Sequence, residues 1–233
     1  MKRSLLVLTA LGLMLSSAWA AAQPDREYVL LIGGPSLQQW EKYKSAPHDH
    51  WWANFVRAGR IRTEQLREKW GPDAKITWLV YEKGYRDRAK QENQDLIGHI
   101  GTVRDKYNLN LIYFDKGEEV INYLNNGQPR DRVKVAFFEF FGHSNKACFM
   151  FDYSSGIDSA CKSWLHENEL VKINRKIFTR DANIRSWGCH TGESFSKKWY
   201  KALGNRMWGV IGKTQYMMNE LPILSSKNGK WVN

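Results

Sequence analysis

The 233-residue sequence predicts an α/β fold with a mostly parallel sheet and helices on both of its faces. Short apolar runs recur along the chain and have the length and composition of buried strands. Helical patterns separate most of these runs, and such alternation is typical of parallel sheets joined by crossover helices. No internal repeat, low-complexity tract or linker interrupts the alternation. We therefore expect a three-layer sandwich in a single domain.

Six apolar runs are expected to form the sheet. The first ends at Gly33-Gly34-Pro35, which we interpret as a turn because a G-x-G-x-x-G phosphate-binding pattern is missing. Residues 148–153 are expected to form an edge strand or one arm of a hairpin. The expected strands of the sheet cover residues 28–32, 75–81, 111–114, 133–141, 182–187 and 207–212.

Helices are expected between the strands, with turn residues such as Gly71-Pro72 marking their ends. The charged segment 82–93 is expected to be a loop or the start of an exposed helix. Residues 225–233 are expected to be a loose or lightly docked tail. The expected helices cover residues 48–70, 96–103, 120–124, 165–178 and 195–203.

The first twenty residues have the pattern of a secretory signal peptide. Lys2-Arg3 precede an apolar stretch over residues 5–15, and Ala18-Trp19-Ala20 fits a small-x-small cleavage site. An N-terminal membrane anchor is the alternative, but the apolar stretch is too short to span a bilayer. We therefore expect a signal peptide over residues 1–20 and one α/β domain over residues 21–233. The mature protein would be periplasmic or secreted, without a membrane span.

The formal net charge is +11. A basic exported protein favours anionic partners such as cell-envelope polymers. Lys and Arg are scattered among acidic residues, however, so a solvated basic surface is the simpler interpretation, and no dense basic run indicates specific nucleic-acid binding. The sequence also contains no cofactor-binding motif, and no cofactor is expected.

The chain has three cysteines, Cys148, Cys161 and Cys189. Export implies an oxidising compartment, in which cysteines tend to pair. Cys148 and Cys161 flank a short loop and are expected to close it with a disulfide. Cys189 is then the odd cysteine, which makes it a candidate reactive thiol. The alternative is that Cys189 is a small buried residue at a tight turn.

His143 and Cys189 each follow an apolar run at its carboxyl end. If the two runs are neighbouring parallel strands, both side chains emerge at the same edge of the sheet. A cysteine nucleophile needs a base and donors for the oxyanion that forms during attack. His143 can supply the base. Backbone N–H groups at Gly188-Cys189, near the start of the following helix, can stabilise the thiolate and the oxyanion.

The histidine and cysteine lie 46 positions apart, in Gly142-His143-Ser144 and Cys189-His190-Thr191-Gly192. Together with the strand–helix order, these two motifs resemble the caspase/gingipain/legumain group of cysteine peptidases, as a divergent bacterial exported member.

The resemblance implies a caspase-like topology and cleavage of a peptide or another amide. It makes Cys189 the nucleophile and His143 the general base, with an oxyanion hole formed by the N–H groups of Cys189 and Ser144. Gly142, Ser144, Gly188 and Gly192 would shape the site. Ser144 stands where the group usually has glycine.

Three further residues could support this pair. His190 is an alternative base, although neighbouring side chains at a strand end point apart. Glu193 is expected to help cap or charge the following helix. Glu139 could pair with a buried cation, orient a catalytic group, or face outward at a strand edge.

Two other functions fit the same sequence. The first is a non-catalytic binding protein of the cell envelope, with residues 142–145 and 189–193 shaping a ligand site. The second is a metal-dependent hydrolase using His48, His50, His143 or His190. His48 and His50 lack an evident partner cluster, so no metal site is expected.

Overall fold

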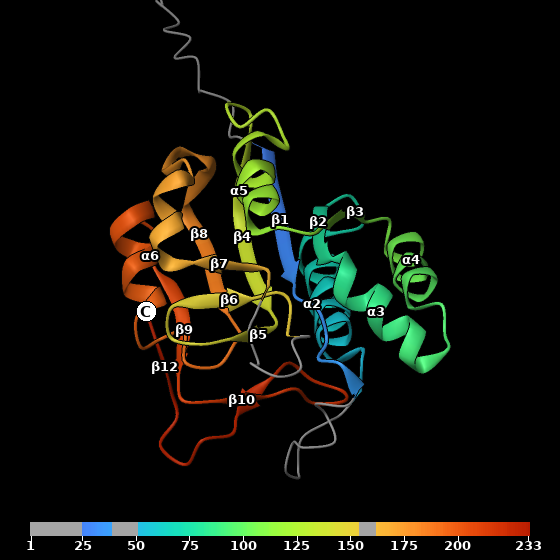
Figure 1. Ribbon diagram of the computed structural model, residues 1–233. Helices are drawn as coiled ribbons and strands as arrows, with labels where there is room; N and C mark the ends of the chain where they lie inside the picture. The colour runs from blue at the N-terminus through green and yellow to red at the C-terminus, as the bar shows by residue number, and fades with distance from the viewer. Residues whose placement is uncertain (1–24, 39–50, 154–161) are drawn as a thin grey trace, which may run out of the picture.

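The computed structural model describes residues 25–38, 51–153 and 162–233. Seven strands form the central sheet, in the spatial order β12-β9-β8-β4-β1-β2-β3 (Figure 1). Six of these strands are parallel, and β12 runs antiparallel to its neighbour β9. The strands are β1(Asp25–Ile32), β2(Lys75–Tyr81), β3(Asn110–Phe114), β4(Val133–Phe141), β8(Phe178–Ser186), β9(Met207–Ile211) and β12(Lys230–Val232).

The direction in which the sheet grows reverses between β1 and β4. From β1 the chain moves outward through β2 and β3, and then returns to add β4, β8 and β9 on the other side of β1. This is the order of doubly wound α/β sheets, whose ligands bind outside the carboxyl ends of the strands at the point of reversal. The loops after β1 and β4 are therefore expected to carry a ligand-binding site.

The core consists of two hydrophobic clusters, to which alternate residues of β1 contribute. Val29 and Leu31 belong to one cluster with the helices α5(Gly117–Asn126) and α6(Phe195–Leu203). Leu30 and Ile32 belong to the other cluster with α2(Asn54–Trp70), α3(Glu82–Glu92) and α4(Leu96–Tyr107). Since successive side chains of a strand point to opposite faces, helices pack against both sides of β1.

Residues that favour the left-handed region end several of the helices. Asn93 and Asn108, with φ of 52° and 49°, follow α3 and α4, and Gly204, with φ of 81°, follows α6. Asp95 begins α4 by accepting a hydrogen bond from the N–H of Gly98. The segment 82–93 is therefore a helix, and its charged composition reflects exposure.

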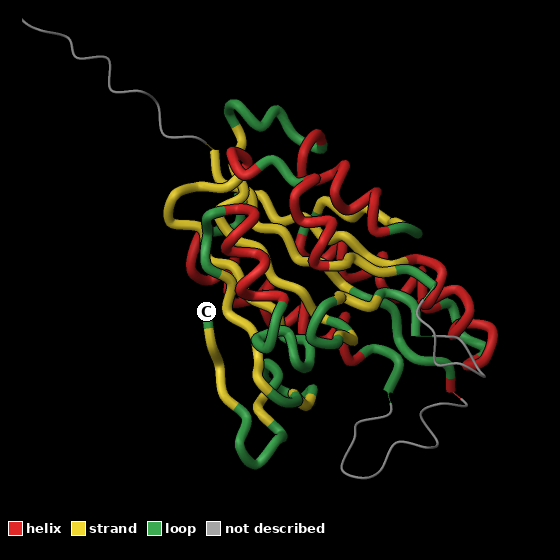
Figure 2. The backbone as a smooth tube through the Cα atoms, turned by 60° about the vertical axis from the view of Figure 1, so that its left-hand side comes forward, coloured by secondary structure: helices red, strands yellow, loops and turns green. Residues whose placement is uncertain are grey.

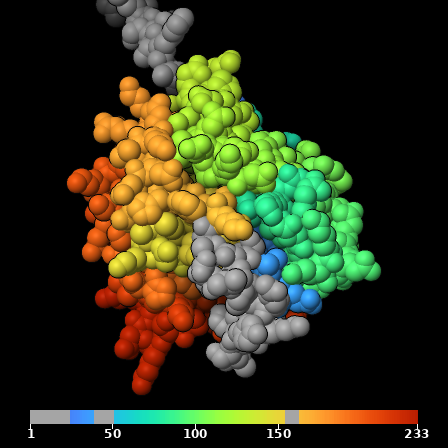
Figure 3. All heavy atoms as spheres, in the orientation of Figure 1, coloured from blue at the N-terminus to red at the C-terminus, as the bar shows by residue number. Residues whose placement is uncertain are grey.

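A second, small sheet lies beyond the carboxyl end of β4. Its antiparallel strands are β5(His143–Ser144), β6(Cys148–Met150) and β7(Trp164–His166), with β6 in the middle. On the face of the molecule shown in Figure 3, the segment around β7 lies beside α5. Residues 148–153 were expected to form an edge strand or a hairpin arm; Cys148–Met150 form a hairpin arm with β5 and lie in the middle of this small sheet. A further short pair, β10(Thr214–Gln215) and β11(Ile223–Leu224), follows β9.

The prediction of a helix over residues 165–178 is wrong. The segment contains β7 and two 3-10 helices, η1(Glu167–Lys172) and η2(Arg175–Ile177). The side chains of His166 and Asn174 accept hydrogen bonds from N–H groups two residues ahead. Each of them thereby caps the start of a separate 3-10 helix, in place of one continuous α-helix. Leu170 and Ile177 are fully buried, so the apolar spacing reflects burial without a continuous helix.

Residues 225–233, expected to be a loose or lightly docked tail, are docked through their last part. Residues 230–232 form β12, which pairs with β9 at the edge of the sheet (Figures 1 and 2). Trp231 packs edge-on against Trp187, with ring centroids 5.1 Å apart. Strand pairing and one aromatic side chain therefore hold this segment to the sheet.

Candidate functional site

A cavity of about 270 Å³ opens at the carboxyl edge of the sheet. Residues from the loops after β1, β4, β8 and β9 line it, together with the residues that precede α2. Its wall includes Ser36, His143, Ser144 and Cys189. The cavity therefore lies at the point of reversal between β1 and β4, where doubly wound sheets bind ligands.

A larger cavity, of about 540 Å³, lies at the amino ends of the strands β1, β2 and β3. Its described lining contains Glu27, Lys75 and Thr77 but no cysteine or histidine. Glu27 is buried and already accepts hydrogen bonds from Thr77, Tyr123 and Arg130. This cavity is larger than the first, but the buried carboxylate at its wall is already engaged by the fold.

His143 and Cys189 occupy equivalent positions on neighbouring strands. β4 and β8 are adjacent and parallel, with Phe140 opposite Ser186, which confirms the expected strand arrangement. Each candidate residue lies three positions beyond its member of that pair. Both are partly buried, and both line the smaller cavity.

Two rings and one hydroxyl group hold the imidazole of His143. The Phe55 ring meets it edge-on and the Tyr153 ring lies tilted against it, each with centroids 4.9 Å away. Ser36 Oγ lies 3.0 Å from His143 Nε2. These contacts come from three segments far apart in the sequence, so the ring orientation depends on the whole fold.

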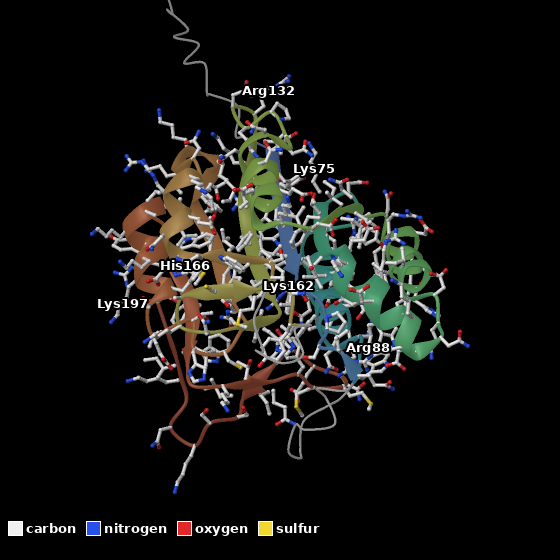
Figure 4. The ribbon with its side chains drawn as sticks, in the orientation of Figure 1. Lys75, Arg88, Arg132, Lys162, His166 and Lys197 are labelled. Carbon is white, nitrogen blue, oxygen red and sulfur yellow. The ribbon has the colours of Figure 1, made fainter. Side chains whose placement is uncertain are left out.

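Ser36 is itself held firmly. Only 1% of its surface is exposed. Its carbonyl oxygen accepts a hydrogen bond of 2.8 Å from Nη1 of Arg88, a buried residue of α3 whose position is labelled in Figure 4. Glu92 pairs with the same guanidinium at 2.6 Å. The charge of Arg88 is thereby balanced while it fixes the loop that carries Ser36.

The sulfur of Cys189 lies against the loop after β9. The Thr214 N–H donates to Sγ at 3.5 Å, and Thr214 Oγ1 lies 3.8 Å from the same atom. The Thr214 hydroxyl donates to the carbonyl oxygen of Trp187 at 2.7 Å. The Thr214 carbonyl oxygen also lies 3.9 Å from Sγ, so the backbone and the side chain of Thr214 together fix the position of the sulfur.

Ser144 joins the histidine loop to the cysteine turn. Its hydroxyl donates a hydrogen bond of 2.6 Å to the carbonyl oxygen of Cys189. A Cβ atom at Gly188 would lie 2.1 Å from Ser144 Oγ, so only glycine fits at position 188. Ser144 and Gly188 are therefore complementary: the serine hydroxyl fills the space that the missing side chain leaves.

The N–H of Ser144 points away from the small sheet. Asn145 N–H donates to the carbonyl of Cys148, which makes the facing Ser144–Phe149 pair the non-hydrogen-bonded one. Around Cys189, the N–H groups of Gly188 and His190 bond to Ser186 Oγ and Gly212 O. The Cys189 N–H makes no hydrogen bond within the described residues.

His190 is paired with Glu193 and not with Cys189. Its Nδ1 lies 2.6 Å from Glu193 Oε1, which also accepts the N–H of Gly212 at 3.3 Å. The hydrogen bond from His190 lowers the pKa of Glu193. His190 has a left-handed backbone with φ of 63°, and the turn that it starts continues to Ser194.

This turn separates Cys189 from the following helix. The helix α6 begins at Phe195, as predicted. Glu193, which was expected to help cap or charge α6, lies directly before the N-cap residue Ser194 and pairs with His190. The N–H groups near Cys189 belong to the turn.

Glu139 pairs with a cation away from the cavity. Its Oε2 accepts hydrogen bonds of 2.8 Å from Arg62 Nε and from Trp187 Nε1. Burial raises the pKa of Glu139, and Arg62 opposes that rise. Since Trp187 stands two residues before Cys189, Glu139 supports the strand that leads to the cysteine but does not line the cavity.

The two remaining glycines have different environments. Gly142 lines the cavity, and its N–H donates to the Tyr216 hydroxyl at 2.9 Å. Burial raises the pKa of Tyr216 well above its usual value. Gly192 packs against β9, where an added Cβ would lie 3.0 Å from the Gly209 carbonyl oxygen. Gly192 is thus a packing residue outside the cavity.

Several predicted features fall outside the described residues. Cys161, His48, His50 and the signal peptide are among them, and the Cys148–Cys161 disulfide stays a prediction. No group of three or more His, Cys, Asp or Glu residues in the described ranges could hold a metal ion. Among the described helices, none has both the length and the apolar character needed to cross a membrane.

Ser36, Phe55, Thr214 and Tyr216 are site residues that the sequence did not single out. Ser36 follows Gly33-Gly34-Pro35 at the carboxyl end of β1, so the rule for sheets of this type could have found it. Thr214 and Tyr216 follow the apolar run that forms β9, so the same rule applies to them. Phe55 falls within the helix predicted over residues 48–70, and nothing local to it points to His143.

Comparisons with protein-family models, with curated proteins and with solved structures gave no match.

Proposed function

We propose that the protein is an exported cysteine hydrolase that cleaves a peptide or another amide, with Cys189 as nucleophile and His143 as general base. One observation carries the proposal. The two residues stand at equivalent positions beyond adjacent parallel strands and line the same cavity. A three-layer arrangement and a caspase-like topology are part of the proposal, and the parallel order of β4 and β8 supports them.

The contacts of His143 define how the base works. Ser36 Oγ lies 3.0 Å from Nε2. In the neutral tautomer that donates its Nε2–H to Ser36 Oγ, the lone pair is on Nδ1, and this nitrogen takes the thiol proton in the proposed reaction. In this arrangement Ser36 orients the base in the way that a third residue does in other nucleophile–base pairs.

The reaction has two halves. The Cys189 thiolate attacks the amide carbonyl carbon, and the N–H groups of Cys189 and Ser144 bind the oxyanion. His143 returns its proton to the amine as the carbon–nitrogen bond breaks, which leaves a thioester on the sulfur. Water, deprotonated by His143, then attacks the thioester, and the acid is released as the thiol is restored.

A second candidate is a non-catalytic binding protein of the cell envelope on the same scaffold. The observation that favours it is the extent to which the two residues are already held. The His143 ring is enclosed by Phe55 and Tyr153, and the Cys189 sulfur accepts from Thr214. Such contacts also suit fixed walls of a ligand cavity. The positive net charge of +11 favours an anionic envelope polymer as partner.

An acylating probe directed at thiols separates the two functions. The folded wild-type protein, Cys189→Ala and the control Cys148→Ala are incubated with the probe, and the labelled peptide is identified by mass spectrometry. The hydrolase predicts labelling at Cys189 in the wild type and in Cys148→Ala, and none there in Cys189→Ala. Wild type labelled no more than Cys189→Ala would refute the nucleophile and leave the binding protein.

A further inference from the structure

Five aromatic side chains contribute to the described lining of the cavity, and they are referred to together as the aromatic wall. They are Trp51, Trp52, Phe55, Tyr153 and Tyr216. The Trp51 and Trp52 rings lie 5.5 Å apart, and the Phe55 and Tyr216 rings lie 4.8 Å apart. Phe55 and Tyr153 also contact His143, so the aromatic wall begins beside the proposed base.

Trp51 is the most exposed of these five rings. It is 44% exposed, whereas Trp52 and Phe55 are 8% and 5% exposed and Tyr153 and Tyr216 are partly buried. An exposed indole at the mouth of a cavity gains by contact with an apolar group that enters. Arg57 lies over the Trp51 ring at 4.8 Å and holds it from one side.

The described lining contains no aspartate or glutamate. Asp152, next to the lining residue Tyr153, is buried with its Oδ2 unpartnered within the described residues, but it does not belong to the described lining. A basic side chain in the cavity would therefore meet no carboxylate among the described lining residues, which is unfavourable. Among those residues the only lysine or arginine is Lys213, which is exposed and offers an acidic side chain little more than a screened contact.

The volume limits the size of the group that enters. Pockets for drug-sized ligands hold about 300–1,000 Å³, and this cavity holds about 270 Å³. It therefore suits one large side chain with the reacting bond beside it.

We infer that the substrate of this site presents an uncharged aromatic or large aliphatic side chain next to the scissile carbonyl. The inference rests on the proposed hydrolase, because it takes Cys189 as the atom that meets that carbonyl. The aromatic wall supplies the selectivity, and Trp51 is its most exposed member.

Peptidyl acyloxymethyl ketones that differ only in the last residue test this inference. Probes ending in Phe, Leu, Asp and Arg are used on the full protein, and the rate constant for labelling Cys189 is measured for each. We expect Phe and Leu to react about 10-fold or more faster than Asp and Arg. Trp51→Ala should narrow that gap, while Trp164→Ala, which replaces an equally exposed tryptophan outside the cavity, should leave it unchanged.

The outcomes distinguish the two proposals. If no probe labels Cys189 above the background of Cys189→Ala, the hydrolase itself fails. If Cys189 reacts but the Arg or Asp probe is as fast as the Phe probe, the hydrolase stands and the substrate class is wrong. If the ratio of the labelling rates between the Phe and Leu probes and the Asp and Arg probes is the same in Trp51→Ala as in wild type, the aromatic wall does not cause the selectivity. Iodoacetamide, which needs no side-chain pocket, should label Cys189 at the same rate in wild type and in the control Trp164→Ala.

Discussion

The two ends of the central sheet carry polar clusters of opposite kinds. At the amino end, Glu27 is 1% exposed and accepts hydrogen bonds from Thr77, Tyr123 and Arg130. At the carboxyl end, His143 and Cys189 are partly buried and line a cavity. One cluster is closed upon itself, and the other presents its reactive atoms to a space.

The difference separates groups that stabilise a fold from groups that can react. A buried carboxylate that already accepts three hydrogen bonds has little capacity for a substrate, and its removal leaves a buried cation unpaired. A thiol and an imidazole that line a cavity can meet a substrate that enters it. The cavity at the carboxyl ends of the strands, although smaller, is therefore the candidate site.

The largest expected effect is on stability at the closed end. Glu27→Ala should lower the free energy of unfolding by about 3–5 kcal/mol, because Arg130 stays buried without its partner. Urea denaturation measures the loss. The control is Asp25→Ala, on the same strand as Glu27. It removes an exposed ion pair with Lys75 of β2 and should cost about 1 kcal/mol or less. Equal losses of unfolding free energy in the two variants would show that the buried pair is no more important for stability than the exposed one.

Gly188→Ala tests the fit between the histidine loop and the cysteine turn. The added methyl group meets Ser144 and should cost about 1–3 kcal/mol of stability. Gly188→Ala combined with Ser144→Gly should recover most of the loss, because the serine side chain is the obstacle. A double variant whose loss equals the sum of the single losses would show that the two residues do not interact.

Ser36→Ala tests whether acylation of Cys189 depends on the orientation that Ser36 gives to His143. Acylation of Cys189 should slow by about 10- to 100-fold, since a misplaced catalytic group costs rate of that order. Ser36→Thr, which keeps a hydroxyl, should restore part of the rate. A structural role alone predicts a loss of stability with an unchanged acylation rate at temperatures where Ser36→Ala is folded.

The smallest effect concerns Glu193 and pH. The hydrogen bond from His190 lowers its pKa in the folded protein, so the charged form stabilises the fold above the unfolded pKa of about 4.3. That stabilisation disappears as the pH falls through the folded pKa. Because Glu193 is partly exposed, we expect less than about 1 kcal/mol. The stability difference between wild type and Glu193→Gln should shrink in acid, and a constant difference would be contrary to the pairing.

Local patterns were enough to predict much of the fold. Lys75–Tyr81 and Phe195–Leu203 have the bounds expected from apolar runs and turn residues, and β4 ends at the expected residue. Strand–helix alternation also brought His143 and Cys189 to one edge, because parallel strands align their carboxyl ends.

Contacts between distant segments could not be predicted in the same way. Ser36 reaches His143 only because β1 and β4 are neighbours, and Phe55 reaches it from the first turn of α2. The segment 165–178 has apolar spacing that suits a helix, but capping by His166 and Asn174 breaks it. Trp231 anchors the tail through a partner more than forty residues away.

The most direct test of the central claim is the rate constant for acylation of Cys189 in wild type and in His143→Gln. If His143 deprotonates Cys189, the substitution should slow acylation by about 10²- to 10⁴-fold while the protein remains folded. Equal rate constants in the two proteins would show that the pair does not act together, and would contradict the proposed hydrolase.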